Sequence, residues 1–144
     1  MTVPAWTYDG NIITELTDMP ENTWGIVYMI TTEQGKKYIG KKQLISIRKR
    51  KFGKKEAALV TDTRLKLYET VIKESNWNLY TGSNKELNED IKNGVKYKKQ
   101  ILHFCRDKKH LAYLETKELF VREVLEHDEY YNSNISGKFY HKDT

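Results

Sequence analysis

The sequence has 144 residues, of which 38% are hydrophobic and 31% charged, and its formal net charge is +5. This length fits one domain, and a 12% share of aromatic residues argues against disorder. The single cysteine, Cys105, excludes an internal disulfide and favours a reducing compartment. Because there is neither a signal-like start nor an apolar run of the roughly 20 residues that a membrane helix needs, we expect an intracellular, cytoplasmic protein without a membrane partner.

The positive charge is concentrated in one segment. Residues 34–55 contain ten Lys or Arg and no acidic residue, whereas the rest of the chain has fifteen basic and twenty acidic side chains. A localised basic field on a folded domain favours a polyanion such as nucleic acid. A solvated lysine-rich surface is an equal alternative on this feature alone.

Two hairpins are predicted in the first third of the chain. Within residues 6–13, Asp9-Gly10 stands between β-favouring residues and predicts a small N-terminal hairpin. Residues 25–32 form a β-rich run, and a glycine-containing turn separates them from a second short strand at 37–40. These two strands predict a second hairpin.

The next part of the chain is harder to interpret. Residues 43–52 predict a basic helix. In residues 56–74, Val60 and Leu67 approximate helical spacing, whereas Leu65 and Leu67 also fit the alternation of a strand. We favour a helix at the start of this stretch and leave both readings open after Leu65.

The following segment predicts a helix and then a strand. Ser83 with Glu86 three residues later predicts a capping box, and Asn93-Gly94 ends the helix. Residues 97–105 predict a strand.

The last helix follows Asp107, a candidate N-cap, and the tail at 128–137 is expected to be irregular. Its apolar positions are predicted to share one face: Leu111, Leu114, Val121 and Leu125. The complete order predicts an α/β fold, with a small three-stranded antiparallel sheet flanked by helices.

The second hairpin carries a recognisable motif. Residues 25–30 read Gly-Ile-Val-Tyr-Met-Ile, and residues 38–41 read Tyr-Ile-Gly-Lys. They resemble the signature of the GIY-YIG nuclease family, Gly-Ile-Tyr followed after ten or eleven residues by Tyr-Ile-Gly. Val27 interrupts the first half, so Tyr28 is the residue carried over, ten positions before Tyr38. The chain looks most similar to small phage-encoded, homing-endonuclease-like members.

The resemblance implies a single GIY-YIG-like nuclease domain at 23–132, after an N-terminal extension at 1–22 and before a tail at 133–144. It implies a metal-dependent endonuclease that hydrolyses phosphodiester bonds of DNA, most readily double-stranded DNA. The expected metal is Mg²⁺ or Mn²⁺. The oligomeric state stays open, with a dimer among the options. Two rival hypotheses are a non-catalytic nucleic-acid-binding module and a protein-interaction domain.

The resemblance also implies roles for individual residues. Tyr28 and Tyr38 lie on one face of the hairpin and position or deprotonate the attacking water. A tyrosine pKa near 10 is too high for a base at neutral pH, and Lys41 is expected to lower it. Arg48 corresponds to a helix-borne arginine that offsets charge on the phosphate. Where the family often has His or Tyr one turn later, this chain has Phe52.

The expected metal ligand is Glu115, on the last helix. Glu118 competes, but Arg122 four residues later offers it an ion pair within the helix. Asn132 matches a late asparagine of the family that orients the site or contacts the phosphate. The remaining basic residues are expected to contact DNA: Lys37, Lys42, Lys49, Arg50, Lys51, Lys54 and Lys55.

Overall fold

The computed structural model describes residues 2–51 and 68–144. The chain divides into two compact units. The core unit comprises residues 1–44 and 76–144, and the ribbon unit comprises residues 45–75.

The core unit contains a mixed five-stranded sheet in the order β2-β1-β7-β3-β4. Strand β3 (Gly25–Thr32) lies between β4 (Lys37–Gln43) and β7 (Tyr97–Cys105) and is antiparallel to both. Strand β1 (Trp6–Tyr8) pairs with β7 in parallel and with β2 (Asn11–Ile13) in antiparallel orientation. The α/β class and the three predicted strands are confirmed, and these strands pair in antiparallel orientation as expected. The sheet is nevertheless five-stranded and mixed, not three-stranded and antiparallel.

The additional strands come from the N-terminal hairpin, which is confirmed. Its turn has φ angles of 49° at Asp9 and 82° at Gly10, the left-handed conformation that a two-residue hairpin turn requires. Trp6 on β1 is fully buried, and its indole N–H donates to the Trp77 carbonyl oxygen at 2.8 Å. This contact between Trp6 and the Trp77 backbone holds the hairpin on the sheet. The local sequence pattern of the hairpin contains no information on so distant a partner.

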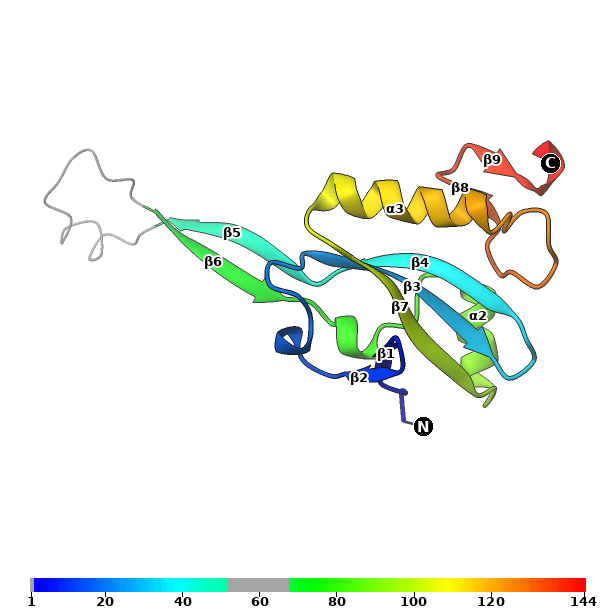
Figure 1. Cartoon of the computed structure of the whole chain (residues 1–144), viewed down its shortest axis with the longest axis horizontal. Coiled ribbons are helices and arrows are strands. Elements are labelled where there is room, and N and C mark those ends of the chain that lie inside the picture. Colours follow the sequence, from blue (N-terminus) through cyan, green and yellow to red (C-terminus); the bar gives the residue numbers. More distant parts are fainter. Residues whose placement is uncertain (1, 52–67) are drawn as a thin grey trace, which may run out of the picture. The chain divides into compact units, whose positions relative to one another are not determined.

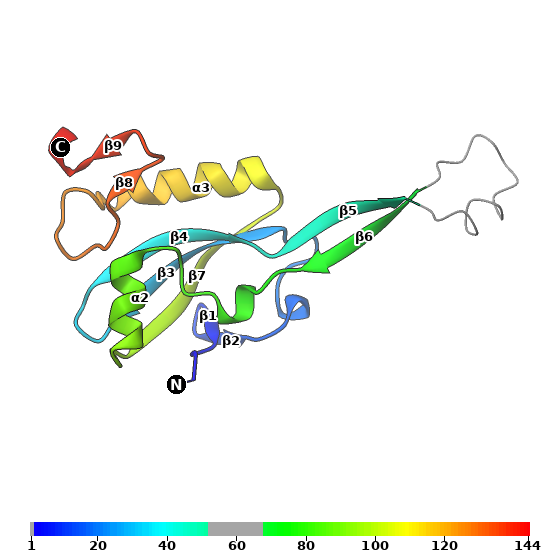
Figure 2. The same ribbon diagram turned by 180° about the vertical axis from the view of Figure 1, so that it is seen from behind.

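In the part of the chain that the structure describes, two α-helices accompany the sheet (Figures 1 and 2). Helix α3 (Lys108–Val121) packs on β3, β4 and β7, and α2 (Lys85–Lys92) lies on the other side of the sheet. Asp107 caps α3 as predicted, by accepting from the amide three residues later at 2.8 Å. The cap of α2 is Asn84, not Ser83, because the Asn84 side-chain oxygen accepts a hydrogen bond from the Leu87 amide at 2.9 Å.

The predicted apolar face of α3 is only partly correct. Leu111 is buried, but Val121 is 69% exposed. The helix ends at Val121, and Glu123 then takes a φ of 51°, which changes the direction of the chain. Leu125 is buried from outside the helix, so helical spacing does not apply to it.

The C-terminal segment contributes to the core of this unit. The Lys37 amide donates to the Glu129 carbonyl, and the Tyr131 amide donates to the Lys37 carbonyl, both at 2.7 Å. Strands β8 (Asn134–Ile135) and β9 (Phe139–Tyr140) then form a short hairpin, with Ile135 buried. The expectation of an irregular tail at 128–137 is therefore correct for most of that stretch, and β8 is the part that departs from it.

The ribbon unit consists, in its described part, of two antiparallel strands (Figure 1). Strand β5 (Ile45–Lys51) pairs with β6 (Tyr68–Glu74), and Ile47 stands opposite Ile72. The predicted basic helix at 43–52 is wrong. The prediction relied on the basic composition of this segment and gave too little weight to its β-branched residues at alternate positions. Such residues favour a strand, and cross-strand partners stabilise it.

The described end of the 56–74 stretch, β6, agrees with the strand alternative. Several residues of the sequence analysis lie outside the described residues: Phe52, Lys54, Lys55, Val60, Leu65 and Leu67. Neither of the described helices is long and apolar enough to span a membrane.

Candidate active site

Two tyrosines and a glycine of the β3–β4 hairpin pack against one another. Tyr28 stands opposite Gly40 in the register, and Ile30 stands opposite Tyr38, so both tyrosines lie on the same face, with ring centroids 6.2 Å apart. A Cβ at Gly40 would overlap the Tyr28 hydroxyl group. A Cβ at Gly82 would lie 2.9 Å from the Tyr38 ring. The glycine of the Tyr-Ile-Gly motif is thus required by close packing of the tyrosines.

The loop before α2 forms a wall around this pair. The Tyr80 ring packs edge-on against Tyr28, with centroids 6.3 Å apart. The Lys42 ammonium lies 4.2 Å from the centroid of Tyr80, and the Ser83 side chain hydrogen-bonds Tyr38. The sequence analysis did not predict Ser83 as a site residue. Its position directly after the loop glycine Gly82 is the sequence feature that could have indicated this role.

Burial controls the acidity of both tyrosines. It raises the pKa of Tyr28 well above 10, and the neighbouring charges of Tyr38, Tyr80 and Glu115 act in the same direction. Burial also raises the pKa of Tyr38, against the opposing hydrogen bond from Ser83. The expected lowering of a tyrosine pKa is therefore wrong, and both hydroxyl groups are protonated at neutral pH in the free protein.

Lys41 instead faces Glu115. Lys41 stands opposite Val27 in the register and so lies on the α3 face of the sheet. Its ammonium nitrogen is 3.9 Å from a Glu115 carboxylate oxygen. The Glu115 side chain is only 19% exposed, and burial raises its pKa while Lys41 opposes the shift. The carboxylate is therefore incompletely compensated.

Glu118, one turn later on α3, has the opposite surroundings. One carboxylate oxygen lies 2.7 Å from Arg122 Nε, and the other lies 2.7 Å from His103 Nε2. Burial alone raises the pKa of Glu118, but hydrogen bonds and charge from Arg122 and His103 outweigh burial and lower it. The expected Glu118–Arg122 ion pair is confirmed, so this carboxylate already has its partners.

Asn132 fixes the edge of the sheet. It is only 6% exposed, its amide nitrogen donates to the Ile39 carbonyl at 2.8 Å, and its oxygen accepts from the Ile39 amide at 3.0 Å. Ile39 lies next to Tyr38 on β4. The asparagine thus holds the strand that carries the second tyrosine.

A polar cavity of about 530 Å³ lies beside β4 and reaches several of these residues. Its lining includes Tyr38, Ser83, Asn84, Glu115, Tyr131 and Asn132. Glu115 and Glu86 supply carboxylates to this cavity and Lys85 supplies an ammonium group, whereas the other polar side chains supply hydroxyl and amide groups. Such a cavity suits a polar ligand.

Glu115 fits a hard divalent cation. Within residues 2–51 and 68–144, no group of three or more His, Cys, Asp or Glu side chains could hold a metal. A single carboxylate with water molecules is a common arrangement for Mg²⁺. The incomplete compensation of the Glu115 charge favours such a cation at this position.

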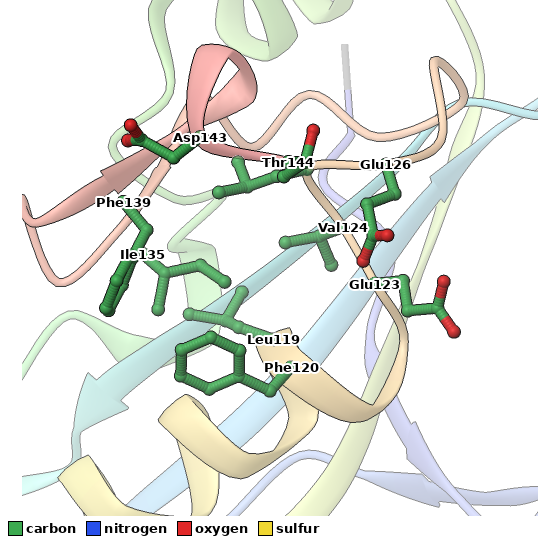
Figure 3. A pocket seen from close by; sticks show the side chains of 10 residues that line it. Leu119, Phe120, Glu123, Val124, Glu126, Ile135, Phe139, Asp143 and Thr144 are labelled. Atoms are coloured by element: carbon green, nitrogen blue, oxygen red, sulfur yellow. The ribbon is translucent and has the colours of Figure 1, made fainter.

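A smaller apolar cavity of about 110 Å³ lies beside the C-terminal hairpin (Figure 3). Its side chains include Leu119, Phe120, Ile135 and Phe139, with carboxylates of Glu123 and other residues nearby. None of the predicted site residues that the structure describes lines it. This cavity is therefore separate from the predicted site.

Three of the six predicted catalytic residues line the polar cavity: Tyr38, Glu115 and Asn132. Tyr28 packs against Tyr38, and Lys41, on the opposite face of the sheet from the tyrosines, lies 3.9 Å from Glu115. The sixth, Arg48, lies on β5 in the ribbon unit and not on a helix. Of the predicted DNA contacts, Lys37 and Lys42 lie in the core unit, and Lys37 is 3.9 Å from Glu129. Three others lie on β5: Lys49, Arg50 and Lys51.

Comparison with known proteins agrees with the motif. The family model "Putative endonuclease segE, GIY-YIG domain" matches residues 6–135, which include both tyrosines, Glu115 and Asn132. Neither the curated proteins nor the solved structures give a match. Nucleases of this family generally use a divalent metal, and their substrate is DNA. The chain therefore belongs to the segE-type GIY-YIG endonuclease family and is a phosphodiester hydrolase.

Proposed function

We propose that the polar cavity beside β4 is the active site of a metal-dependent DNA endonuclease. The observation that carries the proposal is the difference between two carboxylates. Among the described residues, Lys41 at 3.9 Å is the one ion-pair partner of Glu115, which lines the cavity, whereas Glu118 is bound by two side chains. Of these two carboxylates, Glu115 is the one whose charge a bound cation would neutralise.

Glu115 would hold the divalent cation, Mg²⁺ or Mn²⁺, and the scissile phosphate would occupy the cavity next to it. A bound cation would supply Lewis acidity for the phosphate and for the leaving 3′ oxygen. Lys41 is half exposed, with 48% of its side chain accessible. It exchanges its contact with Glu115 for the phosphate when the substrate binds.

Tyr28 is the proposed base that takes a proton from the attacking water. Its raised pKa makes the ionised form rare at neutral pH, so the reaction speeds up as pH rises. Tyr38 is a second candidate for this proton. It lines the cavity and Ser83 opposes the rise of its pKa, two properties that suit a base in contact with the water.

Asn132 acts as a positioning residue. Both polar ends of its side chain bond the Ile39 backbone, so its effect on the reaction passes through the placement of β4 and Tyr38. Arg48 is proposed to offset charge on the phosphate of bound DNA. Lys37 and Lys42 contact the backbone of double-stranded DNA, which adds affinity without sequence preference.

A plasmid-nicking assay tests the proposal. Wild type, Glu115→Gln, Glu118→Gln and Tyr28→Phe are incubated with supercoiled plasmid and Mg²⁺, Mn²⁺ or EDTA. We expect the wild type and Glu118→Gln to nick only with metal, and Glu115→Gln to be inactive although folded. Normal nicking by Glu115→Gln would exclude this glutamate as the metal ligand. One active site cuts one strand at a time. Linear plasmid therefore requires a second binding and cleavage event or a dimer with two active sites.

A further inference from the structure

The ribbon unit carries an apolar pair in an exposed position. Ile47 and Ile72 stand opposite each other on β5 and β6, with 59% and 65% of their surfaces accessible. Alternation along each strand places Lys49 and Thr70 on the same face. A two-stranded ribbon has marginal stability alone in water, and one that exposes such a pair is typical of a surface that binds something.

The other face of the ribbon is rich in cations. Arg48, Arg50 and Lys73 lie on it by alternation, and Glu69 pairs with Arg50. Together β5 and β6 contain five Lys or Arg residues and two Glu. The partner of this ribbon is therefore expected to be anionic, which favours DNA over a second copy of the ribbon.

The dimensions of the ribbon fit a groove of DNA. Two paired strands lie about 4.8 Å apart, and seven residues extend about 23 Å. The major groove is about 12 Å wide and admits a two-stranded ribbon, whereas the minor groove is about 6 Å wide. At about 3.4 Å per base pair, the ribbon spans roughly seven base pairs.

We propose that the β5–β6 ribbon lies in the major groove of the DNA substrate, with Ile47 and Ile72 against thymine methyl groups. The long cations of the opposite face reach back to the phosphates at the groove edges. The inference rests on the proposed function, since the ligand is the substrate of the active site. It adds a source of sequence preference, because the major groove displays the thymine methyl group and phosphate contacts do not distinguish bases.

The first test removes the proposed apolar contact from either side. Uracil replaces thymine in the DNA, or alanine replaces the two isoleucines in the protein. Duplexes are taken from the sites that wild type cuts in a randomised library and prepared with thymine or with uracil, which lacks the methyl. Binding is measured by fluorescence anisotropy in EDTA for wild type, the double variant Ile47→Ala/Ile72→Ala, and the control Ile12→Ala. Ile12 on β2 is 67% exposed and lies outside the ribbon.

We expect wild type and Ile12→Ala to bind thymine DNA roughly fivefold more tightly than uracil DNA, and the double variant to lose this difference. Equal binding of both duplexes by wild type, or an unchanged difference in the double variant, would overturn the inference. So would a change of oligomeric state in the double variant, because the apolar face would then join copies of the chain. Circular dichroism checks that the double variant is folded.

The second test concerns the cationic face. Arg48→Gln and Lys73→Gln should each reduce the slope of log affinity against log salt by about 0.9 and leave the thymine preference intact. Lys117→Gln on α3 is the exposed control and should leave the slope unchanged. If wild type nicks plasmid but neither ribbon test shows an effect, the ribbon inference fails while the nuclease stands. If wild type does not cut, the proposed function itself fails.

Discussion

Two neighbouring turns of α3 carry carboxylates that are almost equally buried but differ in their charged and hydrogen-bonding partners. The side chains of Glu115 and Glu118 are 19% and 17% exposed. Glu118 has two close hydrogen-bonding partners, His103 and Arg122, and a lowered pKa, whereas Glu115 has a more distant Lys41 and a raised pKa. The difference teaches that burial alone does not distinguish the two carboxylates. The incompletely compensated charge is what singles out Glu115 as the proposed metal ligand.

The largest expected effect is on the rate of plasmid nicking when the charge of Glu115 or of Glu118 is removed. Glu115→Gln should reduce the rate of plasmid nicking by about 10³-fold or more, because the proposed metal site loses its protein ligand. Glu118→Gln should change that rate by less than about tenfold, since its carboxylate acts within the fold. Initial nicking rates at saturating Mg²⁺ measure both. Similar losses in the two variants would break the comparison, because Glu118 would then belong to the site as well.

The next largest effect concerns the tyrosines. Tyr28→Phe should slow nicking by about 10²- to 10⁴-fold, the usual contribution of a general base. Since burial raises the pKa of Tyr28 well above 10, the wild-type rate should rise about tenfold per pH unit between roughly pH 7 and 9. Tyr38→Phe is the matched variant. If Tyr38→Phe abolishes the pH dependence of the nicking rate and Tyr28→Phe does not, Tyr38 is the base and Tyr28 supports it by packing.

The hairpin that carries the tyrosines could be predicted because its information is local. The strand alternation, the turn glycine and the Tyr-Ile-Gly motif all lie within residues 25–40. The Glu118–Arg122 pair was also local, at helical spacing. The surroundings of Glu115 were not, because Lys41 reaches it from β4, 74 positions earlier in the chain.

The errors share a physical cause. Basic composition favoured a helix at 43–52, but pairing with β6, whose strand begins at Tyr68, stabilises a ribbon there. The sheet gained strands through Trp6, whose partner Trp77 lies 71 positions away. In both cases, the structure depends on contacts with a distant segment, which the local pattern does not contain.

A smaller effect is expected on stability from the Glu118 region. The lowered pKa of Glu118 means that its ionised form stabilises the fold above the unfolded pKa, and this contribution is lost as pH falls through the lowered folded pKa. Glu118→Gln should therefore reduce the free energy of unfolding at pH 7 by about 2–3 kcal/mol, as breaking a buried charged network does. Urea unfolding monitored by circular dichroism measures the change. No loss at pH 7 would show that Arg122 and His103 do not stabilise this carboxylate.

The smallest effect has the opposite sign and comes from Glu115. Because its folded pKa is raised, ionised Glu115 destabilises the fold above that pKa, and the penalty disappears as pH falls to the unfolded pKa. Glu115→Gln should therefore raise the free energy of unfolding at pH 7 by up to about 1 kcal/mol, with little change near pH 4. Urea unfolding at the two pH values, without added metal, measures this difference. A clear loss of stability at pH 7 would mean that Lys41 already compensates Glu115, and the distinction between the two carboxylates would then fail.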